Sequence, residues 1–117
     1  MSLEASLYAI LSSLVAGRVY PDLTPEPPVF PCIVYQQVGG KAEDYVEKTL
    51  PANDNARVQI LVWSKTRLEA STISRQAREA IIGSALNART VAAPISQYHE
   101  YLALFGARQD FDIYYQP

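Results

Sequence analysis

The sequence contains little of the chemistry that most catalytic and metal-binding sites require. Its 117 residues include one cysteine, Cys32, and one histidine, His99. A single cysteine cannot form an internal disulfide or a thiolate zinc site, and a single histidine cannot supply a set of histidine ligands. The cysteine count agrees with a reducing compartment and equally with an assembly held together by contact area alone. We therefore expect no bound metal and no cofactor.

Long apolar runs and clusters of positive charge are missing too. No uninterrupted apolar stretch exceeds five residues, and the chain opens Met-Ser-Leu-Glu, with an acid where a signal peptide would carry Lys or Arg. Secretion and membrane insertion are therefore not expected. Ten Lys and Arg stand against twelve Asp and Glu, and the positive residues are scattered from Arg18 to Arg108. Binding nucleic acid through its phosphates needs a basic stripe, so we expect no membrane partner and no sequence-specific nucleic-acid partner.

Three small groupings could still carry chemistry, and each has a simpler structural explanation. Cys32 follows a proline at the start of an apolar strand, which is typical of a buried thiol and not of a nucleophile paired with His99. Asp110 and Asp112 lie about 7 Å apart by strand rise, but without a third polar partner they indicate a solvated strand face. The glycine pair at 39–40 lacks the other residues of a phosphate-binding loop. The sequence thus predicts no catalytic residues, and we expect a protein that is not an enzyme.

What the sequence does contain is a long strand pattern that runs directly into a helical one. Val58, Ile60 and Val62 alternate with a mixed set of polar, apolar and aromatic residues, which is the period of a strand with one buried face and one mixed face. Thr66-x-x-Glu69 then forms a capping box, and apolar residues recur at helical spacing through Ile81. We expect a strand over 56–64 followed almost at once by a helix.

The N-terminal region predicts a second helix and a stiff connector. Residues 2–16 place their apolar side chains on one stripe, Ser2 can cap the start, and Gly17 suits a left-handed cap at the end. The opposite face carries serines where a membrane-bound helix would carry Lys or Arg, which favours packing in a core. Five prolines fall within residues 21–31, so this passage is expected to be an extended connector. Its Pro-x-x-Pro pattern has no flanking Arg or Lys to support an SH3-type ligand.

A strand over 32–38 is separated from the strand over 56–64 by some seventeen residues, which are mostly charged or polar. Loops longer than about 12 to 15 residues are uncommon in compact domains unless they are functional or disordered. We therefore interpret this segment as an arm that contacts a partner. The alternative is a polar loop with no specific role.

The C-terminal region, residues 91–115, is rich in aromatic and branched residues and predicts two strands. Phe111, Ile113 and Tyr115 share one face of the last strand, and its preceding turn lies near 99–101 or at 105–106. We expect this last strand to lie at an edge of the sheet. Tyrosines gather here and could either fill a subunit interface or cover the core. They are Tyr98, Tyr101, Tyr114 and Tyr115.

Taken together, these patterns predict one α+β domain that spans residues 1–117. Its elements follow the order α-β-β-α-β-β. The expected architecture is an antiparallel sheet of about four strands with two helices packed on one face. A long β-arm joins the first two strands.

Four segments follow one another in a distinctive order after an opening helix. They are Arg18-Val-Tyr-Pro-Asp22, then Pro31 to Gln36, then Arg57 to Thr66, and finally Phe111 to Tyr115. This succession resembles the small tail-completion proteins of long-tailed bacteriophages and prophages, and it covers most of the chain. Members of that family are similar to tail terminators, which form a ring, commonly hexameric, that caps the tail tube and joins it to the head connector. The resemblance implies the same role here and brings no catalytic residues.

The implied partners are further copies of this chain in a ring, the tail-tube protein, and a head-completion or connector protein. The implied location is the virion tail, after assembly in the host bacterial cytoplasm. We expect the arm and the C-terminal strand to build the contacts to neighbouring subunits or to the tube. The candidate residues are Glu43, Asp44, Tyr45, Glu47, Lys48, Tyr114 and Tyr115.

Three acids of the arm have a second expected role. Glu43, Asp44 and Glu47 would face the channel of the ring, where negative charge keeps passing DNA from sticking. The alternative to the whole assembly hypothesis comes from a different class of protein. It is a small monomeric α+β module that binds a ligand or nucleic acid on its own.

Overall fold

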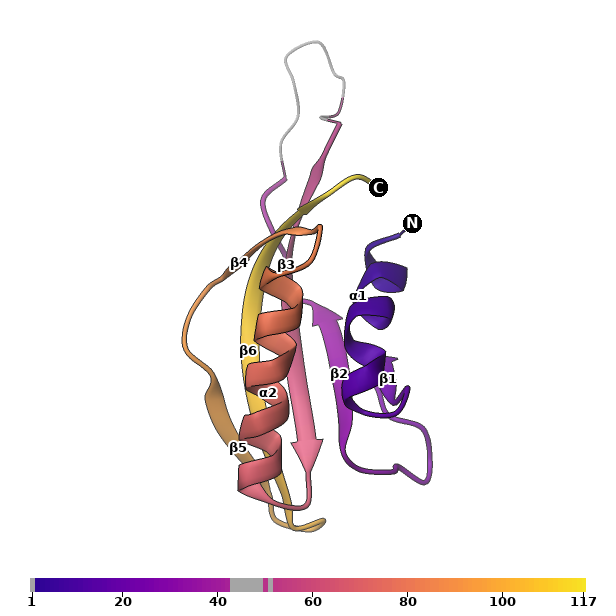
Figure 1. The fold of residues 1–117 in the computed structure, drawn as a ribbon, viewed down its shortest axis with the longest axis vertical. Coiled ribbons are helices and arrows are strands. Elements are labelled where there is room, and N and C mark those ends of the chain that lie inside the picture. The colour runs from indigo at the N-terminus through magenta and orange to yellow at the C-terminus, as the bar shows by residue number, and fades with distance from the viewer. Residues whose placement is uncertain (1, 43–49, 51) are drawn as a thin grey trace.

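The computed structural model describes residues 2–42, 50 and 52–117 (Figure 1). These residues form two α-helices, one short 3-10 helix and a six-stranded sheet, so the expected α+β class is confirmed. The elements are α1 (Leu3–Leu11), η1 (Ser12–Leu14), β1 (Val19–Pro21), β2 (Cys32–Gln37), β3 (Asp54–Ser64), α2 (Arg67–Ile82), β4 (Asn87–Thr90), β5 (Ile95–His99) and β6 (Leu104–Tyr115). Neither described α-helix is long and apolar enough to cross a membrane.

The sheet is organised around β3 and β6, which pair antiparallel along their whole lengths. The register runs from Asp54 opposite Tyr115 to Ser64 opposite Phe105. β2 pairs antiparallel with the other edge of β3, and β1 pairs parallel with β2. β4 and β5 both pair antiparallel with the remaining edge of β6, one after the other along its length. The two outer edges of the sheet are therefore β1 on one side and β4 with β5 on the other.

This topology corrects three sequence-based expectations. The sheet has six strands where about four were predicted, because β1 and β4 were not recognised. β1 is three residues long and β4 four, so neither is long enough to show a clear two-residue period. The order is accordingly α-β-β-β-α-β-β-β, and the sheet contains one parallel pair. The last strand, β6, is an interior strand and not an edge strand, because β4 and β5 cover its outer side.

The first helix is shorter than predicted but has the expected N-cap. The Ser2 hydroxyl accepts a hydrogen bond from the Ala5 N–H at 3.1 Å. The α-helix ends at Leu11 and tightens into η1, which begins with two consecutive serines, a residue type of lower helix propensity than Ala or Leu. Gly17 then takes a φ of +81° and donates its N–H to the Ser12 carbonyl at 2.8 Å. Gly17 is therefore left-handed as predicted, but it lies beyond the helix, whose C-cap is Ser12.

The corner between β3 and α2 is held by a three-residue polar relay. The Thr66 hydroxyl accepts from the Glu69 N–H at 3.2 Å, as the capping box predicts. The Glu69 carboxylate accepts from the Ser64 hydroxyl, and the Ser64 oxygen in turn accepts from the Thr66 N–H at 3.3 Å. Because Ser64 is fully buried, this relay satisfies its hydroxyl and fixes the angle at which the helix leaves the sheet.

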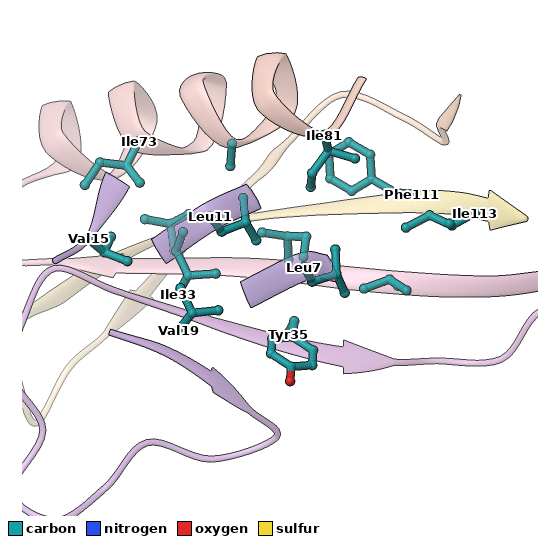
Figure 2. Close-up of a cluster of buried hydrophobic side chains, with 14 of the residues drawn as sticks. Leu7, Leu11, Val15, Val19, Ile33, Tyr35, Ile73, Ile81, Phe111 and Ile113 are labelled. Atoms are coloured by element: carbon teal, nitrogen blue, oxygen red, sulfur yellow. The ribbon is translucent and has the colours of Figure 1, made fainter. Parts of the chain in front are cut away.

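The hydrophobic core lies between the sheet and the two helices (Figure 2). β3 contributes every second residue to it, and Val58, Ile60 and Val62 are almost fully buried as their alternation predicts. Burial of each large side chain contributes roughly 1.5 to 3 kcal/mol before conformational entropy is charged. The cluster consists of Leu7, Leu11, Val15, Val19, Ile33, Tyr35, Ala56, Val58, Ile60, Val62, Ile73, Ala77, Ile81, Phe111 and Ile113.

A close contact on the helix-free face of the sheet yields the first prediction. Gly106 on β6 pairs with Trp63 on β3, and a Cβ added to Gly106 would lie 2.8 Å from the indole ring. We expect Gly106→Ala to lower the free energy of unfolding by about 1 to 3 kcal/mol, because the ring or the strand must shift. Urea denaturation followed by circular dichroism measures this loss. In a Trp63→Leu background the same change should cost much less, and an equal cost in both backgrounds would contradict the explanation.

Candidate functional site

Both helices cover the same face of the sheet, which leaves the other face without a helical layer (Figure 1). The two aspartates that the sequence singled out lie on this helix-free face. Arg57 contacts Asp110 through Nε and Nη2, each 3.0 Å from Oδ2. The Asn55 side chain donates to Asp112 Oδ1 at 2.6 Å. Both carboxylates are half-buried and engaged by β3, so the prediction of a simply solvated face is wrong in this detail.

Cys32 and His99 do not form a catalytic pair. Cys32 is fully buried on β2, and burial raises the pKa of its thiol to about 11 even though the Arg18 charge lowers it. His99 lies exposed at the end of β5, where its ring is 6.3 Å from the Trp63 ring. β3 and β6 separate the two strands, so about 14 Å of sheet lies between them. The prediction of a buried thiol is confirmed.

The hollows around the described residues are open to solvent. One of about 720 Å³ lies between α2 and β4. A second, of about 610 Å³, lies between the start of α1 and the end of β6. Within the described part of the chain, no group of three or more His, Cys, Asp or Glu side chains could hold a metal ion. These hollows are better suited to contact with a macromolecule than to enclosing a small substrate.

The candidate interface residues fall into two groups. Tyr114 is 38% exposed and Tyr115 is half-buried, and both line the hollow at the end of β6. The other five candidates lie outside the described residues. These five are Glu43, Asp44, Tyr45, Glu47 and Lys48.

The described base of the arm is fixed by backbone contacts between residues 38–39 and β3. Beyond β2, the Val38 N–H donates to the Arg57 carbonyl at 2.7 Å, and the Arg57 N–H donates to the Gly39 carbonyl at 2.8 Å. The Lys41 N–H then donates to the Asn55 side chain at 2.7 Å. Gly40 has a φ of +142°, and a Cβ there would collide with the Asn55 carbonyl.

Asn55 is therefore a residue of this site that sequence reasoning missed. Its side-chain oxygen accepts from Lys41 while its nitrogen donates to Asp112, so one amide joins the arm to β6. The available sequence signal was an Asn directly before a strand, which is equally typical of an ordinary turn. Its role depends on β6 lying beside β3, and local sequence does not report that pairing.

The two edges of the sheet differ in their capacity to pair with another strand. On β1, the Val19 N–H is already bonded to the Gly17 carbonyl at 3.0 Å, and Pro21 has no N–H. The Pro21 carbonyl accepts from the Leu23 N–H at 2.6 Å. These local bonds close the outer side of β1 to strand addition.

On the opposite edge, β5 has backbone groups that can pair with another strand. Val91 donates its N–H to the Asp110 carbonyl at 3.0 Å, so the even-numbered residues of β6 direct their backbone groups towards β4 and β5. In an antiparallel pair, successive residues direct their backbone groups alternately towards the partner strand and away from it. The odd-numbered residues of β5 therefore bond to β6, and the N–H and C=O groups of Ser96 and Tyr98 point outward. Among the described residues, no strand pairs with this outer side of β5, which is therefore an edge that could accept another strand.

Comparison with known proteins gives a consistent result. The model of the family described as "Tail completion protein gp17" matches residues 6–116 of this chain. A chain in the solved structure titled "Virion of native gene transfer agent (GTA) particle" is similar in fold, with a TM-score of 0.64 and 18% sequence identity. The similarity covers 99% of this chain and 96% of that chain. No curated protein matches the sequence.

The buried thiol gives a prediction for alkaline pH. Burial raises the pKa of Cys32 from 9.0 to about 11, and burial with Glu4 and Asp22 nearby raises the pKa of Tyr35. Between pH 9.0 and about 11 the unfolded chain therefore loses these protons first, so the free energy of unfolding should fall as pH rises. Urea denaturation at several pH values measures the slope, which Cys32→Ser should reduce.

A thiol-reactive dye provides the control for that prediction. At pH 8 the native protein should react with the dye only as fast as it unfolds, whereas protein in urea should react at once. Rapid labelling of the native protein would show that Cys32 is accessible and would contradict the assignment.

Proposed function

Because the chain belongs to the tail completion protein gp17 family and is a structural protein of a phage-type tail, we propose that it caps the tail tube as a ring and joins the tail to the head connector. The family match over residues 6–116 is the observation that carries this proposal. The ring is a hexamer of this chain, as the sequence resemblance implies. Its partners are the tail-tube protein and a head-completion or connector protein, and it assembles in the host bacterial cytoplasm.

The shape of the subunit supports a ring. Head-to-tail rings need two different surfaces on opposite sides of each subunit, because each copy must contact one neighbour on each side. The sheet has such sides, with β1 at one edge and β4 with β5 at the other. The hollows among the described residues are open, which agrees with a role in assembly rather than in small-molecule chemistry.

We assign contact with the tube to the end of the subunit from which the arm leaves. Gly40, Asn55 and Asp112 lie together there, and Tyr114 and Tyr115 lie at the same end of β6. An exposed tyrosine beside a hollow suits an interface, because its ring buries area while its hydroxyl stays hydrated. The arm continues from this end, and its acids Glu43, Asp44 and Glu47 face the channel in the proposal.

One observation favours a different function. Three arginines line the hollow between α2 and β4, and a group of that kind can bind phosphates. The alternative is therefore a monomeric module that binds nucleic acid or an anionic ligand. Light scattering with added tail-tube protein separates the two proposals, because a persistent monomer that ignores the tube protein supports the module.

Shortening the arm tests the assembly proposal directly. Replacing residues 42–54 with Asn-Gly, a dipeptide that closes two-residue hairpins, keeps Lys41 and Asn55 in register. We expect the variant to fold with near-native stability and to lose tail completion, because the contact to the tube is removed. Complementation of a phage that lacks the gene, scored by infectivity and by tail length in electron micrographs, measures the loss.

The shortened variant needs a folding control, and one outcome would contradict the prediction. Circular dichroism and thermal unfolding must show that the shortened protein is folded, since only a folded variant reports on contacts. Normal tail length and infectivity from this variant would remove the arm from the proposed function. A Tyr114→Ala variant serves as a milder change at the same end of the molecule.

A further inference from the structure

The hollow between α2 and β4 is a basic groove. We define the arginine groove by Arg75 and Arg78 on α2 and Arg89 on β4, with Ile82 and Ala88 as apolar lining. Glu79 also lines it and lies 3.4 Å from Arg75, in a pair whose side chains are 82% and 68% exposed. Such an exposed pair is weak. Three arginines against one glutamate leave the groove with two net positive charges.

The groove continues along the edge of the sheet. A smaller hollow of about 330 Å³ is lined by the same two helix arginines, Arg75 and Arg78, together with Pro94 and Ser96 of the β5 side. Ile82, which lines the larger hollow, is 45% exposed, so apolar surface accompanies the charge along this side. The groove is therefore suited to an extended segment that carries both acidic and apolar side chains.

The opposite edge of the same molecule carries a segment of that description. The connector between β1 and β2, residues 22–31, contains Asp22 and Glu26 and no Lys or Arg. Both acids are exposed, and Leu23 and Val29 are 80% and 56% exposed. The connector thus offers two negative charges and two large apolar side chains to solvent.

A connector cannot reach the groove of its own subunit. The strand order places β2, β3 and β6 between β1 and β4, so roughly 19 Å of sheet separates the two edges. Figure 1 shows the connector beside β1 on one side of the molecule and α2 with β4 and β5 towards the other. The complementary surfaces are therefore available only between different copies.

We propose that the connector of one copy docks in the arginine groove of the next copy, and that this head-to-tail contact repeats around the ring. The inference rests on the proposed ring and specifies which surfaces close it. Asp22 and Glu26 meet Arg75, Arg78 and Arg89 of the neighbour. Leu23 and Val29 cover the apolar lining beside Ile82.

Two alternatives for the groove are less well supported. Nucleic acid would satisfy the arginines but would leave the exposed acids and apolar side chains of the connector unexplained. A symmetric dimer would need the groove and the connector on one shared face, so that each could meet the other on the partner, but they lie at opposite edges of the sheet. A head-to-tail contact brings these two opposite edges of successive copies together and uses both surfaces.

Charge exchange between the two surfaces tests the proposal. One variant carries Arg75→Glu with Arg78→Glu, a second carries Asp22→Lys with Glu26→Lys, and a third carries all four changes. In the presence of tail-tube protein, each of the first two should need about tenfold or more protein for half-maximal ring formation, measured by light scattering. The third should assemble like the unmodified protein, because every interface regains opposite charges.

Mixing provides a second test of the geometry. An equimolar mixture of the first two variants should assemble, since alternating copies bring opposite charges together at every interface. A variant with Lys65→Glu and Arg67→Glu controls for net charge, because it changes the total by as much as the first variant but at the far end of α2. It should assemble like the unmodified protein.

The outcomes separate this inference from the proposed function. If the unmodified chain forms no ring with the tube protein, the ring and the docking contact both fail. If the ring forms and the two charge-reversed variants assemble equally well, only the docking contact fails. Loss of binding to a short DNA duplex by the first variant, with ring formation intact, would show that the groove binds nucleic acid and would overturn the inference.

Discussion

The pairing of β3 with β6 is the constraint on which the rest of the structure depends. The two strands run antiparallel in an unbroken register from Asp54 and Tyr115 to Ser64 and Phe105. One face of this pair carries the core side chains, and both helices pack on it (Figure 2). The other face brings Asn55 and Arg57 against Asp112 and Asp110. Because a one-residue slip would exchange the two faces, the core and the base of the arm are specified together.

The parts of this fold that the sequence predicted are those with long, locally coded patterns. β3 and β6 show clear alternation, and α2 begins at a capping box whose Thr66 contact is present. β1 and β4 were missed because they are short and become strands only by lying beside β2 and β6. The position of β6 inside the sheet was missed for the same reason, since one strand's pattern does not reveal what lies beyond it.

The candidate site was less accessible to sequence reasoning than the fold. Arg75 and Arg78 are spaced along one helix, but Arg89 joins them only because β4 pairs with β6 beneath α2. A formal net charge of -2 conceals this arrangement, since the total says nothing about how charges are distributed over two edges. The role of Gln109 at this edge was not evident from the sequence either. Its buried side chain donates to the Ala92 carbonyl at 2.8 Å and holds the link between the two strands of the basic edge.

The difference between the two sheet edges also bears on how copies of this chain can meet. Strand addition between β1 and β5 would extend the sheet from copy to copy, but Pro21 and the local bonds of Val19 close β1. Pairing of β5 with β5 would be isologous and would stop at a dimer. If the β1 edge takes part in the proposed ring, it therefore does so through side chains and not by strand addition. The connector beside β1 carries its acidic and apolar side chains in the exposed position that such a contact requires.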